Sequence, residues 1–387
     1  MGTFRQLKSG KWQARVYIEG QYESIGTFRT KKEAEIEAGK VEERLYFGQT
    51  LNDRQILFRE IATEWIEVHK KNELDESTYP NYKSVLENHI IPFFGNRRLM
   101  NIKRIDIKKW LADYANQEKE DGTPKYSYGS MLRYLSIIKQ VFHYAVNDRE
   151  VLEKDPSLRL RVPVKRNKET QKKATKYLSL DEQNRLLDFM ETYRHQRFPE
   201  YKLYYILIYF MLQTGLRISE ALAVRWNDIN ANILTVERQT KRNSNNKVVL
   251  ASLKTNSSYR EIRLDNKLLE ELRTFRNIQN DCFNKYSSFI QNRDGIIFQN
   301  YQGKYLTPSI VREMFSKYSA AAGVPYKGTH GFRHTHAVLL LESGASIKYV
   351  SKRLGHKSIK VTADTYLDVT KKIEEDELEK FALYTKR

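Results

Sequence analysis

The stretch from Thr329 to Tyr366 constrains the fold more than any other part of the chain. A helical pattern runs from Thr329 until Gly344, and glycine is a common residue just past a helix C-terminus. A second helical pattern begins at Ser346 and stops at Gly355. The sequence therefore predicts two consecutive helices, with a tight turn between them and another turn after the second.

Four polar side chains stand out along this stretch. His330 and Arg333 are three residues apart, so they share one face at the start of the first predicted helix. His356 falls on the turn just past the second helix, and Tyr366 follows ten residues later on a short helical or irregular segment. A guanidinium, two imidazoles and a phenol arranged in this way are suited to binding an anionic phosphate and attacking it.

Two upstream motifs extend this set. They are Thr214-Gly215-Leu216-Arg217-Ile218-Ser219-Glu220 and Leu253-Lys254-Thr255-Asn256. In chain order the candidates become Arg217, Lys254, His330, Arg333, His356 and Tyr366. The order resembles the catalytic set of the tyrosine recombinase (phage integrase) family, which is Arg, Lys, His-x-x-Arg, His or Trp, then Tyr. Because order, local context and spacing all agree, we predict an integrase of a phage or conjugative-transposon type.

The resemblance implies a role for each residue. Tyr366 is expected to be the nucleophile, because it is the tyrosine at the family's distance from His356. Glu220 is expected to hold Arg217, although in isolation Arg217 could be a helix-start arginine that only pairs with Glu220. Lys254 is expected to be the family's hairpin lysine, with other lysines nearby as competitors.

The resemblance also implies the chemistry. The tyrosine would form a 3′-phosphotyrosyl link and release a 5′-hydroxyl, so no ATP, metal or other cofactor is expected. Protomers would exchange strands in pairs through a Holliday junction. A zinc site is the alternative for His330, His334 and His336, but Gly331 stands where zinc proteases carry glutamate. No carboxylate or cysteine supplies a third ligand at a typical interval.

Composition limits which binding partners and which cellular compartment are expected for the protein. The 387-residue chain carries a net charge of +19 and has a pI near 9.6, which indicates nucleic acid or an anionic membrane as partner. The longest apolar run, 203–212, is about half of a bilayer span, and no apolar signal-peptide core follows Met1. A single cysteine, Cys282, excludes an internal disulfide. We expect a cytoplasmic, nucleoid-associated bacterial protein that binds double-stranded DNA attachment sites and no membrane.

Residues 1–50 are predicted to form a small domain of three strands and a helix. Thr30 caps the helix, which runs to about Phe47, and Glu33 completes a capping box. The strand-like runs are 4–7, 12–18 and 22–28. The basic face of this sheet resembles the arm-binding domain of integrases, and strands can enter a major groove. Its DNA-contacting candidates are Arg5, Lys8, Lys11 and Arg15, and the alternative is a solvated module that binds nothing.

After a short linker at 48–52 the pattern is helical and resembles the family's core-binding domain, which we place at 56–158. The apolar stripe of its first helix is predicted to be Ile61, Trp65, Val68 and His69. Two longer helices are expected at 105–116 and 126–148. Basic side chains on their polar faces are either merely solvated or contact phosphate. The DNA-contacting candidates are Lys108, Lys125, Arg133 and Lys139.

A basic interdomain linker is predicted at 159–176, where Lys and Arg are dense and no apolar period is visible. Ser179 with Glu182 then forms a capping box that opens the last domain, 177–387. The run around 201–214 is apolar nearly all round, as in a buried core helix.

Strand-like runs at 233–236, 248–250 and 261–264 suggest one small antiparallel sheet in the last domain, and Lys254 falls at a turn between two of them. The predicted fold is mainly α with small antiparallel sheets. It combines the N-terminal domain of three strands and a helix, the helical core-binding domain, and an α+β catalytic domain of the tyrosine recombinase type.

The tail after Tyr366 carries apolar residues without an obvious local partner, namely Val369, Ile373, Leu378 and Phe381. In the family this tail docks on a neighbouring subunit, which implies a homotetramer on DNA. We predict site-specific integration or excision of a mobile element, with accessory DNA-bending or directionality proteins as further partners. The alternatives are a chromosome-dimer resolvase or topoisomerase-like relative, and a noncatalytic DNA-binding regulator. The added N-terminal domain argues against a plain resolvase, and the complete residue set argues against a regulator.

Overall fold

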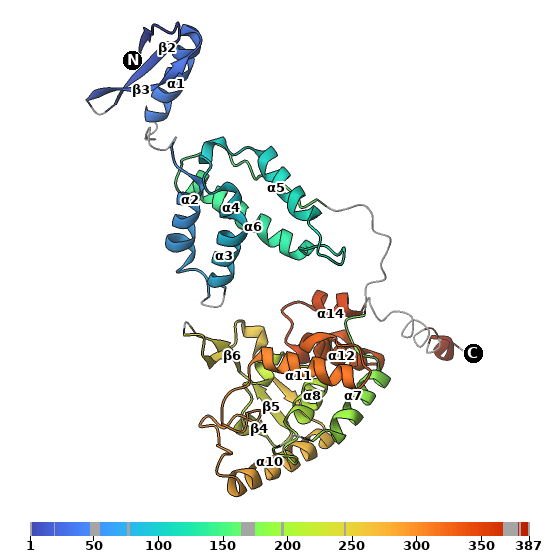
Figure 1. Ribbon diagram of the computed structural model, residues 1–387. Helices are drawn as coiled ribbons and strands as arrows, with labels where there is room; N and C mark the ends of the chain where they lie inside the picture. Colours follow the sequence, from blue (N-terminus) through green and yellow to red (C-terminus); the bar gives the residue numbers. More distant parts are fainter. Residues whose placement is uncertain are drawn as a thin grey trace. The chain divides into compact units, whose positions relative to one another are not determined.

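The structure, a computed structural model, describes residues 2–18, 20–46, 55–75, 78–163, 175–194, 197–243, 245–366, 378 and 381–385, with the backbone alone at 44 and 364–366 (Figure 1). The chain divides into two compact units, residues 1–168 and 169–387. Several predicted features lie outside the described residues: the linker at 48–52, most of the basic linker at 159–176, and the tail residues Val369 and Ile373.

The first unit begins with an antiparallel sheet in the order β1-β2-β3, and α1 packs against it. These elements are β1 (Thr3–Gln6), β2 (Trp12–Ile18), β3 (Gln21–Phe28) and α1 (Lys31–Tyr46). The predicted capping box is present, because the Glu33 amide donates to the Thr30 hydroxyl at 3.2 Å and the Thr30 amide donates to the Glu33 carboxylate at 3.3 Å. A small core joins sheet and helix through Ala14, Val16, Ala34, Ala38 and Val41.

The rest of the first unit is helical. Its elements are α2 (Phe58–Glu64), α3 (Tyr79–Val85), α4 (Ile91–Phe94), the 3₁₀ turn η4 (Leu99–Asn101), α5 (Arg104–Asn116) and α6 (Tyr128–Asn147). The two long helices predicted here are confirmed within two residues at each end. α6 begins where it does because the Ser127 hydroxyl accepts a hydrogen bond from the Ser130 amide at 3.1 Å.

Two of these helices continue into π-helical turns, η2 (Trp65–Lys70) and η3 (Leu86–Ile90). Hydrogen bonds in a π turn span one more residue than in an α turn, so the side chains beyond it rotate to another face. Ile61 and Trp65 are buried as predicted, but Val68 is 65% exposed and Ile66 is buried instead. The predicted stripe is wrong at Val68, because α-helical spacing does not hold through η2.

α8 (Leu203–Thr214) lies at the centre of the second unit and, as predicted, is buried on nearly all sides. It packs against α7 (Leu180–Thr192), α10 (Asn266–Lys285), α11 (Pro308–Ala321) and α12 (Gly328–Glu342). The predicted capping box opens α7, since the Ser179 hydroxyl accepts from the Glu182 amide at 3.2 Å. α8 ends at Gly215, whose left-handed backbone (φ 66°) turns the chain towards the short helix α9 (Ile218–Ala221).

The strands of the second unit form two sheets, where the sequence predicted one. The first has the order β4-β5-β8, and β6 pairs with β7 in a separate hairpin. Their bounds are β4 (Ile229–Asn230), β5 (Ile233–Val236), β6 (Arg238–Arg242), β7 (Val248–Ser252) and β8 (Arg260–Arg263). The prediction is wrong for 248–250, because β7 pairs with β6, the strand that directly precedes it in the chain. The polar sequence of β6 does not predict a strand. Lys254 does lie between β7 and β8.

The helices predicted around Gly344 are confirmed. α12 ends just before Gly344 (φ 87°), and α13 (Ile347–Leu354) follows with the Ser346 hydroxyl accepting from the Tyr349 amide at 3.2 Å. Gly355, in the left-handed region at φ 68°, ends α13. α14 (Ile359–Tyr366) then packs against both α12 and α13.

Replacing Gly215 with alanine should destabilise the second unit strongly. An added Cβ would lie 2.5 Å from Cδ2 of His336 and 2.6 Å from Cδ2 of Leu354, on a backbone with positive φ. We expect Gly215→Ala to lower the free energy of unfolding by about 3 kcal/mol, combining backbone strain with overpacking. Urea denaturation followed by circular dichroism measures it. Gly323→Ala is the control, because Gly323 has φ 62° but nothing within 4 Å of its added Cβ. An equal loss in both variants would show that strain alone matters.

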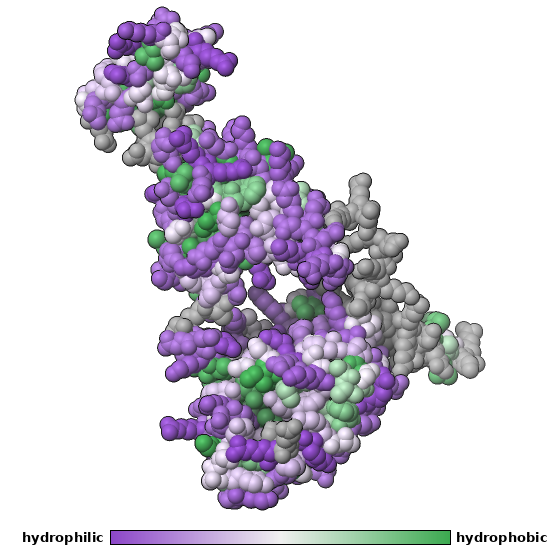
Figure 2. All heavy atoms as spheres, in the orientation of Figure 1, coloured by the Kyte–Doolittle hydropathy of each residue, from purple (hydrophilic) through white to green (hydrophobic). Residues whose placement is uncertain are grey.

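Hydrophilic side chains predominate on the face of the molecule shown in Figure 2. No helix among the described residues has the length and apolar character needed to cross a membrane.

Candidate active site

Arg217 and Glu220 meet at the start of α9. The Arg217 amide donates to Glu220 Oε2 at 3.0 Å, and Arg217 Nη1 donates to Oε1 at 2.7 Å. Glu220 is buried, whereas the Arg217 side chain is 39% exposed. Burial alone would raise the pKa of Glu220, but the nearby charges of Arg260 and Arg217 hold it below its usual value. Glu220 therefore stays ionised and fixes Arg217 with part of its side chain open to solvent.

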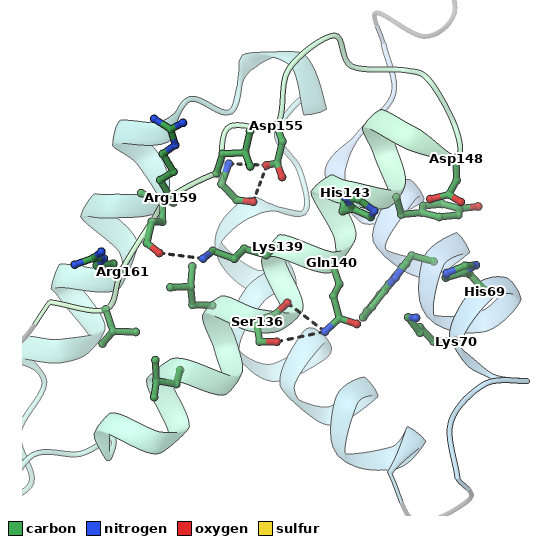
Figure 3. Close-up of a pocket in the computed structure, with 18 of the residues that line it drawn as sticks. His69, Lys70, Ser136, Lys139, Gln140, His143, Asp148, Asp155, Arg159 and Arg161 are labelled. Carbon is green, nitrogen blue, oxygen red and sulfur yellow. Dashed lines mark hydrogen bonds between the residues drawn. The ribbon is translucent and has the colours of Figure 1, made fainter.

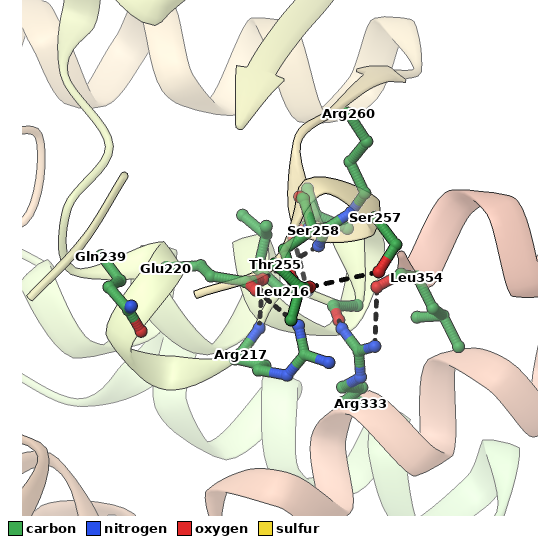
Figure 4. Close-up of polar contacts among 12 residues, drawn as sticks. Leu216, Arg217, Glu220, Gln239, Thr255, Ser257, Ser258, Arg260, Arg333 and Leu354 are labelled. Carbon is green, nitrogen blue, oxygen red and sulfur yellow. Dashed lines mark hydrogen bonds and ion pairs between the residues drawn. The ribbon is translucent and has the colours of Figure 1, made fainter. Parts of the chain in front are cut away.

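Arg333, one turn into α12, is 2% exposed and close to Arg217 (Figure 4). Its Nη1 donates to the Gly215 carbonyl at 2.9 Å and its Nη2 to the Leu354 carbonyl at 2.7 Å. These carbonyls lie at the C-terminal ends of α8 and α13, where helical partners are missing. Burial and the charge of Arg217 lower the pKa of Arg333 to about 9, so it remains protonated at neutral pH.

His330 is an exposed residue in the first turn of α12, and its ring lies perpendicular to that of His334, with the ring centroids 4.8 Å apart. Restricted hydration lowers its pKa to about 4, helped by the positive fields of His334 and Arg333. The imidazole is therefore neutral at pH 7. A neutral imidazole can accept a proton.

His356 follows Gly355 on the turn after α13, as the sequence predicted. Its Nδ1 lies 2.8 Å from the Thr362 hydroxyl on α14. Burial lowers its pKa to about 4, and the charges of Arg333 and Arg217 act in the same direction. Because Arg333 donates to the Leu354 carbonyl, two residues before His356, and lies close to Arg217, these three residues occupy one site.

The two remaining candidates lie at its margins. Tyr366 is the last residue of α14, the helix that Thr362 ties to His356. Lys254 is exposed and precedes the 3₁₀ turn η6 (Asn256–Ser258). The loop that carries Lys254 approaches the site closely, because a Cβ added to Gly355 would lie 2.9 Å from the Ser257 carbonyl oxygen.

Two partly buried arginines of this region, Arg260 and Arg353, were not singled out from the sequence. Arg260 donates to Glu220 Oε2 at 2.9 Å (Figure 4). Arg353 donates to the carbonyls of Gln213 and Arg263, both at 3.0 Å. The sequence holds a signal for Arg260, which follows Lys254 in the pattern Lys-Thr-x-x-Ser-x-Arg at 254–260, but none for the carbonyls that Arg353 contacts.

His336, one of the histidines of the alternative zinc site, packs in the interior of the second unit. It is 6% exposed, with Nδ1 2.7 Å from the Leu212 carbonyl and Nε2 accepting from Arg353 Nε at 3.1 Å.

The site as a whole is cationic. Arg217, Arg333 and Arg260 gather around the buried carboxylate of Glu220, and burial, reinforced by nearby positive charges, lowers the pKa of both His330 and His356. Positive charge left in excess in this way suits an anionic ligand, and planar guanidinium groups match the geometry of phosphate oxygens.

The N-terminal candidates Arg5, Lys8, Lys11 and Arg15 are all exposed. Arg5 pairs with Gln13 and Arg15 with Thr3, so both arginines project from the same face of the sheet. Exposed Tyr17 and Tyr22 extend that face, with ring centroids 5.2 Å apart. The helix α1 packs on the opposite face, which leaves the basic and aromatic one open.

In the helical unit Lys108, Lys125 and Arg133 are exposed, but Lys139 is half-buried. Its ammonium donates to the Leu160 carbonyl at 3.0 Å, inside a pocket of about 790 Å³ between α6 and residues 155–162 (Figure 3). Leu160 and Val162 pack into the helical core, so the packed chain continues beyond residue 158. The ammonium of Lys139 is therefore directed at its own domain.

Comparison with known proteins agrees with this geometry. The pattern of the Phage integrase family matches residues 176–372, just over half of the chain, and that of the phage integrase N-terminal SAM-like domain matches 57–115. The ICEBs1 integrase of Bacillus subtilis (strain 168) is 27% identical over 293 residues, covering 74% of this chain and 73% of the relative. The tyrosine recombinase XerC of Rickettsia bellii (strain RML369-C) is 30% identical over 269 residues, covering 67% of this chain and 75% of its own.

Solved structures share the fold. The Tn1549 transposon integrase, in complex with a circular intermediate DNA, aligns with a TM-score of 0.66 and 20% identity over 84% of this chain and 99% of its own. A lambda integrase tetramer bound to a Holliday junction aligns with a TM-score of 0.55 and 16% identity over 94% of each chain. Since the family pattern spans Arg217, Lys254, His330, Arg333, His356 and Tyr366, this protein belongs to the phage integrase family of tyrosine recombinases.

Proposed function

We propose that this protein integrates and excises a mobile element by cleaving and rejoining double-stranded DNA at attachment sites. The observation that carries the proposal is the convergence of Arg217, Arg333 and His356 beside the helix that ends in Tyr366. Such a cluster offers charge neutralisation and a nucleophile without a metal ligand set. The added N-terminal sheet favours a mobile-element integrase over a plain resolvase.

The reaction would begin at a scissile phosphodiester. The Tyr366 oxygen attacks phosphorus, the bond from phosphorus to the 5′ oxygen breaks, and a 3′-phosphotyrosyl link forms. The phenol loses one proton and the 5′ oxygen gains one, so the step releases no net proton. A second strand's 5′-hydroxyl can then attack the link and release Tyr366, and two such exchanges pass through a Holliday junction.

Each side chain of the site has a role in that step. Arg217 and Arg333 bind the non-bridging oxygens and stabilise the charge of the pentacoordinate transition state. Neutral His330 accepts the phenolic proton. With the Thr362 hydroxyl donating to Nδ1 of His356, its Nε2 carries a proton and donates to a non-bridging oxygen. Lys254 protonates the departing 5′ oxygen.

Assembly completes the proposal. Strand exchange between two sites requires several protomers, and we propose a homotetramer on DNA in which the tail beyond Tyr366 docks on a neighbouring subunit. Leu378 and Phe381 are 68% and 63% exposed, so their apolar surfaces are available for such a contact. Accessory DNA-bending and directionality proteins would act on this assembly.

Covalent capture tests the proposed function. The protein is incubated with a duplex that is nicked beside the crossover, so that the released strand diffuses away and religation is blocked. A recombinase yields a protein–DNA adduct that survives denaturing electrophoresis. A regulator would shift the same duplex in a native gel and leave no adduct.

The N-terminal sheet should act at a DNA site separate from the crossover. Deleting residues 1–50 removes Arg5, Arg15 and the exposed tyrosines of the same face, while the core of the helical unit keeps its own residues. We expect cleavage of a minimal core site within about threefold of wild type and a loss of integration into full attachment sites. A charge-matched control replaces Lys31 and Lys32, on α1 away from that face, with glutamine. Full-rate integration by the deletion variant would contradict the idea.

A further inference from the structure

Arg260 connects three segments that meet at the active site. It is the first residue of β8, and its side chain is only 5% exposed. Nη2 donates to Glu220 Oε2 at 2.9 Å, Nε donates to the Arg353 carbonyl at 2.8 Å, and Nη1 donates to the Ser258 carbonyl at 2.9 Å. One guanidinium thus contacts α9, the end of α13 and the loop after Lys254.

Each of these contacts leads to a different member of the proposed catalytic set. Glu220 holds Arg217 through both of its oxygens. The Arg353 carbonyl lies in the last turn of α13, three residues before His356. The His356 amide itself donates to the Ser351 carbonyl at 3.1 Å. Ser258 ends the turn that follows Lys254, and its hydroxyl lies 2.8 Å from that of Thr255.

The packing around Arg260 leaves little freedom. A Cβ on Gly355 would lie 3.0 Å from Cδ of Arg260 and 2.9 Å from the Ser257 carbonyl oxygen. The loop and the helix end are therefore in direct contact, and the fork of Arg260 joins them. A lysine ammonium has its three N–H donors on one nitrogen atom, so it could not reach all three acceptors that Nε, Nη1 and Nη2 of Arg260 reach from separate positions.

We propose that Arg260 is a positioning residue. Its three hydrogen bonds fix the positions of Arg217, His356 and the Lys254 loop relative to one another. It acts through these neighbours and does not itself contact the phosphate. The inference rests on the proposed recombinase function, since strand cleavage requires these groups in the correct relative positions.

Arg260→Gln and its controls test the proposal in the full-length protein. Displacements of about 1 Å in an active site can cost roughly 10² in rate. We expect adduct formation on the nicked duplex to slow about 100-fold, with half-site affinity within about threefold of wild type. Arg263→Gln removes the same charge from the exposed side of the same strand and should cleave normally. Equal slowing of adduct formation in both variants would show that the loss of one positive charge explains the effect, and it would overturn the proposal.

Two further variants separate positioning from a folding defect. Arg260→Gln leaves Glu220 as a buried carboxylate with one partner fewer, which can unfold the region. The double variant Glu220→Gln with Arg260→Gln removes both charges, and it should cleave no more slowly than the slower single variant. Arg260→Lys keeps a charge beside Glu220, and it should recover thermal stability but less than a tenth of the cleavage rate. Full recovery of cleavage by lysine would contradict the three-way hydrogen-bonded role.

A readout independent of DNA cleavage distinguishes this inference from the proposed function. Amide hydrogen exchange should accelerate at 254–258 and at 355–357 in Arg260→Gln, and at neither segment in Arg263→Gln. Unchanged exchange at both segments would overturn the positioning role. If the wild-type protein formed no adduct, the proposed function would be wrong, while the exchange data would still decide whether Arg260 joins these segments.

Discussion

Tyr366→Phe is expected to abolish the covalent protein–DNA adduct while leaving DNA binding within about threefold of wild type. The substitution removes one oxygen atom, and that oxygen is the proposed nucleophile. No other group can substitute for it, because the phosphotyrosyl link needs a phenol brought to the scissile phosphorus by α14. DNA affinity depends mainly on basic side chains elsewhere, since phosphate contacts dominate such binding.

The measurement is denaturing electrophoresis of the protein with a labelled, nicked duplex, alongside a native gel for affinity. Tyr349→Phe is the matched control. Tyr349 is half exposed, lies on the neighbouring helix α13, and is among the nearest tyrosines in the chain. It should form adduct at the wild-type rate. An adduct that persists in Tyr366→Phe would show that another residue is the nucleophile.

The helices that frame the site could be predicted because residues close to each helix end in the sequence determine where that helix begins or ends. Ser346 caps α13 with its hydroxyl, and Gly344 and Gly355 adopt the positive φ that ends a helix. These signals involve residues within four positions of one another. The segments carrying His330 and His356 were therefore placed correctly without knowledge of what packs against them.

Sheet pairing and helix faces depended on contacts that local patterns do not contain. β7 pairs with β6, whose sequence Arg-Gln-Thr-Lys-Arg shows no apolar alternation. Val68 lies on an exposed face because η2 departs from α-helical spacing. The sequence alone favoured a single sheet and regular α-helical spacing. Tertiary packing instead produces a second sheet and a π-helical turn.

The site residues divide in the same way. A family pattern in the chain order pointed to Arg217 and Arg333, and the structure brings their guanidinium groups together. Arg260 and Arg353 donate to carbonyls that are distant in the sequence. The Arg353 carbonyl lies 93 positions from Arg260, and the Arg263 carbonyl lies 90 positions from Arg353. Nothing in a linear sequence marks which helix end will lie beside which arginine.

Lys254→Ala is expected to slow cleavage by about 10² to 10⁴, the range that general acids contribute, while binding DNA well. Attack by Tyr366 expels a 5′ alkoxide, a poor leaving group that must gain a proton as the bond breaks. Arg217 and Arg333 are assigned to the non-bridging oxygens, so the proton must come from another donor, and the ammonium of Lys254 can supply it. Lys254 is exposed, and the loop that carries it lies against Gly355, next to His356.

A substrate with sulfur at the bridging 5′ position distinguishes an acid from a phosphate contact. A thiolate leaves without a proton, so this substrate should restore the cleavage rate of Lys254→Ala to near that of wild type. It should rescue Arg217→Ala much less, because Arg217 acts on the non-bridging oxygens. Lys247→Ala, which removes an exposed lysine from the nearby β6–β7 turn, should need no rescue. If sulfur fails to restore Lys254→Ala, Lys254 contacts the phosphate and the general acid is another residue.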